Sequence, residues 1–389
     1  MWFFKCPEFY FGEDSLSHLE NLSGKRAYIV TDANIQRLGF VEVVQKHLQE
    51  AGIETAVFAE VEPDPSLQTV QRGAKAMLAF EPDWVIGLGG GSSMDASKAM
   101  WILYERPDIE PEAINPWEEL GLRQKARLIC IPTTAGTGAE ANYGIVLTDT
   151  IEKRKLTLGS REATPDIAIV DPYFTIHLPA QITADTGIDV LSHAIEAYSC
   201  NWANDFTDGL CLQSARLVFQ YLPRAVANGA EDVEAREKMA NAAAIAGITL
   251  GNSQVALAHA LGHSAGAVFK QIPHGRVTAV FLPYTIQFIA NGGAGRYVDL
   301  AKTVELPAAD EQEAAKSLID ATLQLMQQIG TPTSLKEAGV DLQTFQDNLA
   351  MMVEHVEIDA NSLMSRRIPE TEEIEKLLLY AYEGKSVDF

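Results

Sequence analysis

A change of pattern near residue 178 does most to limit what this chain can fold into. Residues 1–180 alternate short β-rich runs with helical patterns, as in AYIVTD (27–32) and DWVIGLGGG (83–91). Strands that each lead into a helix predict a parallel sheet covered on both faces. Residues 180–389 carry long amphipathic helical patterns instead, with almost no strand signal. We therefore expect an α/β domain over residues 1–179, an all-helical domain over residues 180–389, and a ligand site in the cleft between them.

Length and composition are typical of a globular protein with two domains. The chain has 389 residues, more than the roughly 250–300 that a single core usually supports. It is 47% hydrophobic and 21% charged, and its formal net charge is −23. A nucleic-acid-binding protein needs a basic surface to displace counterions, so we expect no nucleic-acid partner.

Cysteine usage and the N-terminal sequence predict the compartment. The four cysteines are scattered without a CxxC spacing, which indicates free thiols in a reducing environment. The N-terminal MWFFKCPEFYFGED lacks the basic and apolar regions of a signal peptide. No apolar run approaches the roughly 20 residues of a membrane helix. The sequence therefore predicts a cytoplasmic protein that does not bind a membrane.

A glycine-rich stretch, GLGGGSSMD (87–95), lies where a predicted strand ends and a helix begins. Contiguous glycines let a ligand approach the backbone, and the N–H groups and positive dipole end of the helix suit a phosphate. Ser92 and Ser93 could cap the helix or bond a phosphate oxygen. Without a ligand, the same residues would form a sharp strand–helix turn. The stretch contains no GKS or GKT, which excludes a Walker-type P-loop.

Asp32 ends an earlier predicted strand, AYIVTD. An acid at this place can accept hydrogen bonds from a ribose 2′-hydroxyl and repel a 2′-phosphate. It could equally be a helix N-cap, because a helix-prone stretch follows it. A third strand end, IPTTAGTG (131–138), again combines hydroxyl residues with glycines. Three such ends in one parallel sheet favour a nucleotide-binding crevice.

Five polar residues in the helical half form a possible metal site. Asp189 and His193 are four residues apart, so they share one helix face. His259 and His263 have the same spacing, and His274 follows in IPHG. One carboxylate and three imidazoles suit Fe²⁺ or Zn²⁺ and leave a position for a substrate oxygen. Five candidates for four positions leave one histidine spare, and the residue types do not say which.

Five motifs together resemble the iron-containing alcohol dehydrogenase family, and the match covers nearly the whole chain. In family order they are GGGSSMDASK (89–98), PTTAGTGAE (132–140), DPYFTIHLP (171–179), DVLSHAIEAY (189–198) and HALGHSAGAVFKQIPHG (259–275). The chain is also similar to the alcohol-dehydrogenase half of bifunctional aldehyde–alcohol dehydrogenases. The resemblance implies a dehydroquinate synthase-like fold, in which a Rossmann-like dinucleotide-binding domain precedes an all-helical metal-binding domain.

The resemblance also implies a role for individual residues. The ligands of Fe²⁺, with Zn²⁺ as the alternative, would be Asp189, His193, His259 and His274. His263 would lie near the nicotinamide as a catalytic proton relay and would not bind the metal. NAD, with NADP less expected, would bind at Asp32, Gly89, Gly90, Gly91, Ser92, Asp95, Thr133, Thr134 and Lys155.

Three departures from the family pattern bear on these assignments. His259 and His274 lie one residue further apart than is usual, which indicates an added residue near Lys270–Gln271. Asn142 stands where threonine is common. The NPR sequence often found near the C-terminus is replaced by residues 365–367, Ser-Arg-Arg, so no role is carried over to them.

Together these features predict a metal-dependent, NAD-linked alcohol dehydrogenase that interconverts primary alcohols and aldehydes by hydride transfer in the interdomain cleft. The expected partners are a small alcohol or aldehyde and further copies of the chain, most simply in a homodimer. One alternative is a dehydroquinate synthase-like lyase, which would need a basic pocket for which Lys270 and Arg276 are the candidates. Another is a filament-forming assembly protein.

Overall fold

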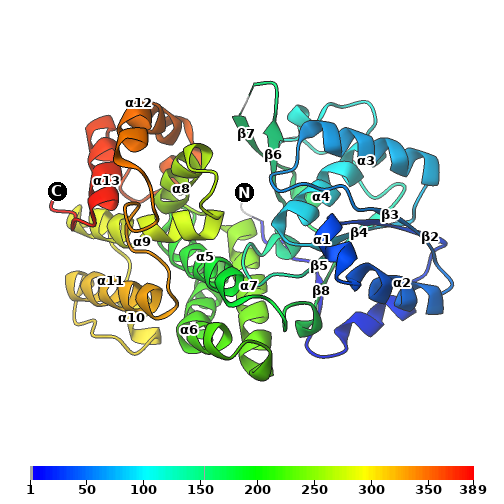
Figure 1. Cartoon of the computed structure of the whole chain (residues 1–389), viewed down its shortest axis with the longest axis horizontal. Helices are drawn as coiled ribbons and strands as arrows, with labels where there is room; N and C mark the ends of the chain where they lie inside the picture. Colours follow the sequence, from blue (N-terminus) through cyan, green and yellow to red (C-terminus); the bar gives the residue numbers. More distant parts are fainter. Residues whose placement is uncertain (1–2, 153) are drawn as a thin grey trace. The chain divides into compact units, whose positions relative to one another are not determined.

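The chain forms two compact units, divided between His177 and Leu178, in a computed structural model that describes residues 3–152 and 154–389 (Figure 1). The strands of the described residues lie in the first unit, which is coloured blue to green in Figure 1. The second unit is built from helices. The predicted fold class, an α/β half followed by a helical half, is confirmed.

A six-stranded sheet organises the first unit. Its strands are β1 (Glu8–Phe11), β2 (Arg26–Val30), β3 (Glu54–Phe58), β4 (Trp84–Gly89), β5 (Arg127–Pro132) and β8 (Ile167–Val170). They are all parallel and lie in the order β1-β8-β5-β4-β2-β3. The α-helices of this unit are α1 (Ala33–Arg37), α2 (Phe40–Glu50), α3 (Leu67–Phe80) and α4 (Gly91–Glu105).

Alternate residues of the central strands are buried on opposite faces of the sheet. In β4, Val85 belongs to the core shared with α3 and α4, whereas Trp84 and Ile86 belong to the core shared with α2. Leu128 and Ile129 of β5 divide between the two cores in the same way. Because both faces are covered, these strands are apolar at successive positions, which is the pattern seen in the sequence.

Successive strands of the chain are placed on opposite sides of β2, so the order of the strands in the sheet reverses there. The chain passes from β2 through α2 to β3, then through α3 on the other face to β4, which lies on the opposite side of β2. Ligands of open α/β sheets bind at the carboxyl ends of the strands at such a reversal. Here those ends carry Asp32, just after β2, and Gly89–Gly91, at the end of β4.

Two parts of the first unit were not predicted from the sequence. One is β1, a four-residue edge strand with the sequence EFYF. The other is an antiparallel hairpin formed by β6 (Gly144–Asp149) and β7 (Arg154–Gly159). Buried and half-buried residues alternate along β6, and its apolar run covers only residues 145–147. This is too short a run to separate a strand from other structures by its pattern alone.

Nine α-helices form the second unit, whose residues are all described. They are α5 (Ala180–Ser199), α6 (Asp205–Asn228), α7 (Val233–Asn252), α8 (Leu257–Val268), α9 (His274–Asn291), α10 (Val298–Thr303), α11 (Glu311–Gln328), α12 (Leu342–Ile358) and α13 (Thr371–Glu383). Helix α5 is buried along most of its length, including its polar residues, and it packs against α6, α7, α8 and α9.

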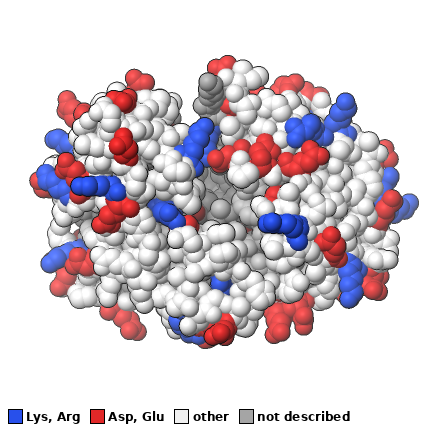
Figure 2. Space-filling view, in the orientation of Figure 1, with Lys and Arg blue, Asp and Glu red and all other residues white. Residues whose placement is uncertain are grey.

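Within the described part of the chain, no helix is both long and apolar enough to cross a membrane. On the face drawn in Figure 2, acidic side chains are widely spread, and basic side chains lie singly or in small groups. This distribution accords with the formal net charge of −23.

Candidate functional site

The glycine-rich stretch connects β4 to α4, and Gly90 and Gly91 at the turn are half-buried. Gly89 has φ +149°, and a Cβ there would lie 2.6 Å from Ser93 Oγ. A Cβ on Gly91 would lie 2.9 Å from Thr137 Cγ2, so this position is also too tight for a larger residue. Gly90 is the N-cap of α4, so the N–H groups of the next residues have no partner within the helix. This helix end is suited to bind a phosphate.

Asp32 lies against this stretch and also caps α1. Its Oδ1 accepts hydrogen bonds from the N–H groups of Asn34, at 2.8 Å, and Ile35, at 3.2 Å. Its Oδ2 accepts one from Ser93 Oγ at 3.4 Å. The two interpretations of Asp32 are therefore compatible, because one oxygen holds the helix while the other faces the glycine-rich stretch.

The remaining predicted cofactor residues differ in their surroundings. Thr133 follows β5, and its N–H donates to Gly89 O at 2.9 Å. The Thr134 side chain lies 3.7 Å from where a Cβ on Gly90 would be. Lys155, on β7, forms an ion pair of 2.8 Å with Asp64. These contacts were not visible in the sequence, because they join separate strands.

Ser92 and Asp95 complete the predicted set. Ser92 Oγ accepts a hydrogen bond of 3.4 Å from the N–H of Asp64. Asp95 Oδ2 accepts one of 3.0 Å from the N–H of Val146, and its Oδ1 lies 3.7 Å from Lys98 Nζ. Burial raises the pKa of Asp95 to about 6, against the opposing charge of Lys98. The carboxylate of Asp95 thus joins α4 to the β6 strand, and the structure does not turn it toward the glycines.

In the second unit, Asp189 and His193 of α5 meet His259 of α8. One donor atom from each lies within 4.8 Å of the other two. Asp189 Oδ1 is 3.7 Å from His259 Nε2, and Asp189 Oδ2 is 3.8 Å from His193 Nε2. All three residues are buried. The spacing of four residues on α5 places the first two on adjacent turns of the same face.

The donor atoms of this cluster fit a divalent cation. Two of these atoms, Asp189 Oδ1 and His259 Nε2, are buried, and neither has a hydrogen-bond partner among the described residues. Two ligand atoms at about 2.1 Å from one tetrahedral ion would be roughly 3.4 Å apart, close to the observed separations. A buried, unpaired carboxylate oxygen is costly, and a cation is the partner that satisfies it together with a neutral imidazole nitrogen.

The protonation states also suit metal binding. Burial, followed by the charge of His193, lowers the pKa of His259 well below its usual value, so this imidazole is neutral. Burial alone would raise the pKa of Asp189, but the surrounding imidazoles outweigh it and lower the pKa. A metal binds deprotonated ligands, and Asp189 and His259 meet this requirement.

His274 borders the cluster as the first residue of α9. Its ring centroid is 5.6 Å from that of His259 and 5.4 Å from that of His263. Lys270 and Gln271, near which the family resemblance indicates an added residue, lie in the turn between α8 and α9, and His274 still lies beside the other two histidines. Although His274 is exposed, the protein around its ring desolvates it and lowers its pKa to about 3.

His263 lies one turn after His259 on α8 and has a different partner. Its Nδ1 is 2.8 Å from Asp359 Oδ2. Asp359 follows α12 and is half-buried. Burial raises the pKa of Asp359, but the hydrogen bond and charge of His263 outweigh this effect, and the pKa is lowered. His263 is therefore held by a carboxylate outside the metal cluster.

Two carboxylates of this region were not predicted from the sequence. Glu196 contacts His259 and is buried; its spacing from Asp189, seven residues along α5, puts it on the same helix face. That spacing was a usable signal. Asp359 has no comparable signal, because the fold alone brings it to His263 from almost a hundred residues away.

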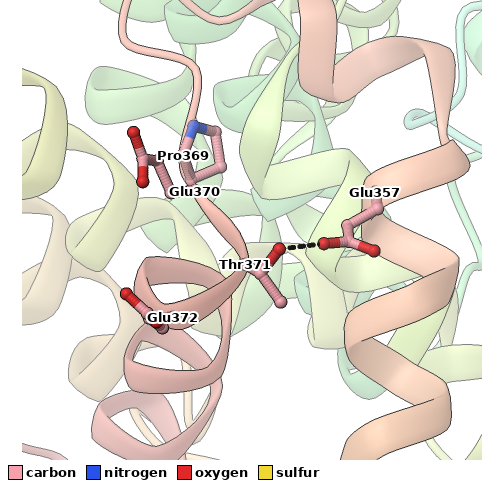
Figure 3. Close-up of a pocket in the computed structure, with 5 residues that line it drawn as sticks. All are labelled: Glu357, Pro369, Glu370, Thr371 and Glu372. Carbon is pink, nitrogen blue, oxygen red and sulfur yellow. Dashed lines mark hydrogen bonds between the residues drawn. The ribbon is translucent and has the colours of Figure 1, made fainter.

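A separate acidic pocket of about 400 Å³ lies between the end of α12 and the start of α13 (Figure 3). It is lined by Glu357, Pro369, Glu370, Thr371 and Glu372. Thr371 Oγ1 donates a hydrogen bond to Glu357 Oε1. The pocket contains none of the predicted site residues, and its carboxylates would repel an anionic cofactor.

Two protein-family models match the chain. The model described as iron-containing alcohol dehydrogenase matches residues 6–172. The model described as Fe-containing alcohol dehydrogenase family, C-terminal, matches residues 183–382. The glycine-rich stretch falls within the first match, and the cluster of carboxylates and histidines falls within the second.

Individual relatives agree with these matches. The NADPH-dependent butanol dehydrogenase of Clostridium saccharobutylicum is 39% identical, with 98% of each chain covered. Aldehyde-alcohol dehydrogenase 2 of Entamoeba histolytica is 38% identical over 98% of this chain, which spans only 46% of that longer protein. An iron-containing alcohol dehydrogenase from Thermococcus thioreducens has a similar structure, with a TM-score of 0.89, 32% identity, and coverage of 99% of this chain and 100% of that one.

Gly275→Ala should loosen the cluster, because a Cβ at this position would overlap the carbonyl oxygen of Asp185 and lie 2.8 Å from Asp189 Cβ. Overpacking against backbone costs roughly 1–3 kcal/mol, and relief would require α9 to move away from α5 together with His274. We expect a lower unfolding midpoint and weaker metal binding, measured by thermal denaturation and chelator competition. Gly266→Ala is the matched control, since its Cβ would meet Val277 at an ordinary 3.5 Å. Equal behaviour of the two variants would contradict the prediction.

Proposed function

The chain belongs to the iron-containing alcohol dehydrogenase family, and we propose that it interconverts primary alcohols and aldehydes with NAD as hydride carrier and a divalent metal, most simply Fe²⁺, as Lewis acid. In this reaction the alcohol gives a hydride to NAD⁺ and a proton to solvent, leaving the aldehyde and NADH. The observation that carries the proposal is the buried group of Asp189, His193 and His259, with its unpaired oxygen and nitrogen atoms.

We propose that the metal is held by Asp189, His193, His259 and His274. The bound ion supplies Lewis acidity, which stabilises negative charge on a substrate oxygen and lowers the pKa of its proton. The first three ligands are buried, whereas His274 is exposed. A substrate would therefore approach the centre from the side of His274.

The cofactor site is proposed at the switch point of the sheet. The glycines would take the pyrophosphate at the start of α4, and Asp32 Oδ2 would accept a hydrogen bond from an adenosine ribose hydroxyl. The full proposed set is Asp32, Gly89, Gly90, Gly91, Ser92, Asp95, Thr133, Thr134 and Lys155, with Asp95 acting through the β6 strand that it holds. Asp32 carries the preference for NAD, because its charge opposes a 2′-phosphate.

His263 is proposed as the proton relay. With Asp359 accepting a hydrogen bond from Nδ1–H, the proton of the neutral ring lies on Nδ1 and the Nε2 lone pair is available. Nε2 can then receive a proton from the substrate side and pass it toward solvent, to which the side chain is 26% exposed. The ring of His274 stacks on that of His263, at 5.4 Å and 19°, which places the relay beside a proposed ligand.

The lyase alternative is not favoured, because it needs a basic pocket and the two candidate residues, Lys270 and Arg276, do not form one. Arg276 gives both of its hydrogen bonds to the Asp185 carboxylate, at 2.7 and 2.8 Å, so its charge is already neutralised. Lys270 lies exposed in the turn between α8 and α9.

We propose that the working form is a cytoplasmic homodimer, whose expected mass is twice the 42.4 kDa of one chain. Its four cysteines are free, and three of them are buried, as is usual in a reducing compartment. Size-exclusion chromatography with light scattering tests the assembly. A concentration-dependent series of long polymers would favour the filament-forming alternative instead.

His274→Ala and His263→Ala should separate a ligand from a relay. The first variant should lose bound metal and activity together, because one of four ligands is gone. The second should keep a full complement of metal while kcat falls roughly 100- to 10,000-fold, as expected for a lost proton-transfer group. The measurement is metal content after anaerobic purification, combined with NADH formation from a primary alcohol.

The control for this pair is the unaltered protein treated with a chelator and then resupplied with Fe²⁺ or Zn²⁺. Activity should disappear and return. Full activity in metal-free protein would exclude the proposed role of the metal, and loss of metal from the His263 variant would make that residue a ligand.

Asp32→Gly should relax the cofactor preference. Removing the charge should raise kcat/KM for NADP by about tenfold or more, corresponding to at least 1.4 kcal/mol, and lower it for NAD. Asp32→Ser is the matched variant, because serine still caps α1 while the charge is lost. If the charge of Asp32 sets the cofactor preference, both variants should shift toward NADP by a similar factor. A preference of the unaltered protein for NADP would contradict this role of Asp32.

A further inference from the structure

Glu196 is a buried carboxylate that none of the roles above uses. It lies on α5, three residues after His193 and seven after Asp189, and is only 4% exposed. A carboxylate at such a depth is unstable unless its oxygens are hydrogen-bonded. Its hydrogen-bond partners therefore decide what it does in the fold.

Both partners of Glu196 belong to the first turn of α8. Its Oε1 accepts a hydrogen bond of 2.6 Å from the N–H of Ala258. Its Oε2 forms a very short hydrogen bond with Nδ1 of His259. The residue at the N-cap of α8, Ala256, makes no side-chain cap of its own. Glu196 therefore takes the place of a capping residue from a different helix.

The second contact fixes which nitrogen of His259 carries the proton. Since a carboxylate accepts, the hydrogen lies on Nδ1 and the lone pair lies on Nε2. This Nε2 is the atom 3.7 Å from Asp189 Oδ1 that is buried without a hydrogen-bond partner. Resting on the proposed metal role, we infer that Glu196 is a positioning residue of the metal centre, which sets the tautomer and place of His259 while it caps α8.

The balance of charge also supports a role of Glu196 at the metal site. Asp189 and Glu196 are two carboxylates within one buried group, and a divalent cation neutralises both. A hydrogen-bonded partner behind a ligating imidazole orients the ring and raises its basicity, and its removal typically costs 10- to 100-fold in metal affinity. Here the same carboxylate also anchors a helix, so metal binding and the seating of α8 on α5 are coupled.

Glutamine cannot replace Glu196 in both contacts. If its oxygen faces His259, its NH₂ group opposes the N–H of Ala258, and α8 loses the cap. If the amide is reversed, its NH₂ donates to Nδ1, and the proton moves to Nε2, where it blocks coordination. Either arrangement should weaken the metal site without removing a ligand.

The test compares Glu196→Gln with Glu105→Gln. Glu105 is also a buried helix carboxylate, and it accepts hydrogen bonds from the N–H groups of Gln124, Lys125 and Ala126 but from no histidine. Zn²⁺ alone is titrated into each metal-free protein against a chromophoric chelator, and the rise of the thermal midpoint on Zn²⁺ addition is recorded. We expect a 10- to 100-fold weaker affinity and a smaller rise for Glu196→Gln only.

Unchanged Zn²⁺ affinity in Glu196→Gln would overturn the inference and leave the proposed function standing. Failure of the unaltered protein itself to bind Zn²⁺ or Fe²⁺ would instead overturn the metal role on which the inference rests. Should Glu196→Gln not fold, the unaltered metal-free protein with ¹⁵N-labelled histidine decides. A proton on Nδ1 of His259 that is protected from exchange supports the inference, and a proton on Nε2 overturns it.

Discussion

The buried carboxylate of Asp189 is the group on which the helical unit depends. A charge among apolar helices is stable only where opposite charge or hydrogen bonds surround it. Imidazoles from α5, α8 and α9 meet there, so α5 and the two later, consecutive helices are held at one point. The close approach of α9 needs the missing side chain of Gly275. The proposed reaction and the packing of the second unit would therefore have the same requirement, a cation between Asp189 and its histidines.

The first unit meets a separate constraint, set by the order of its strands. β3 and β4 lie on opposite sides of β2. The helices that follow β2 and β4, which are α2 and α4, therefore cover opposite faces of the sheet. Asp32 and the glycines are brought together by this topology and not by their separation in sequence. Helix capping and ligand binding share one carboxylate there, since Oδ1 of Asp32 serves the helix and Oδ2 faces the glycines.

Local patterns predicted the parts of the fold that local physics decides. The apolar runs of the central strands and the four-residue spacings on α5 and α8 identified the sheet and the face that carries Asp189 and His193. The hairpin of β6 and β7 gave only a weak signal, because the apolar run of β6 is limited to residues 145–147. Asp359 gave none, because a contact with a histidine almost a hundred residues away depends on tertiary packing. Which histidine is spare could not follow from residue types, since all three are placed by helix geometry that the sequence leaves open.

The turn between α8 and α9 affects how the sequence around the proposed metal site can change during evolution. His274 is the first residue of its helix, and its location follows from the packing of α9 on α5 through Gly275. The packing of α9 does not depend on the length of the preceding turn, in which Lys270 and Gln271 are exposed. Over evolutionary time, the spacing in sequence between His259 and His274 could change while the geometry of the proposed metal site is kept. Insertions in this turn would be tolerated, because they would change the residues beside the proposed metal site without moving its ligands.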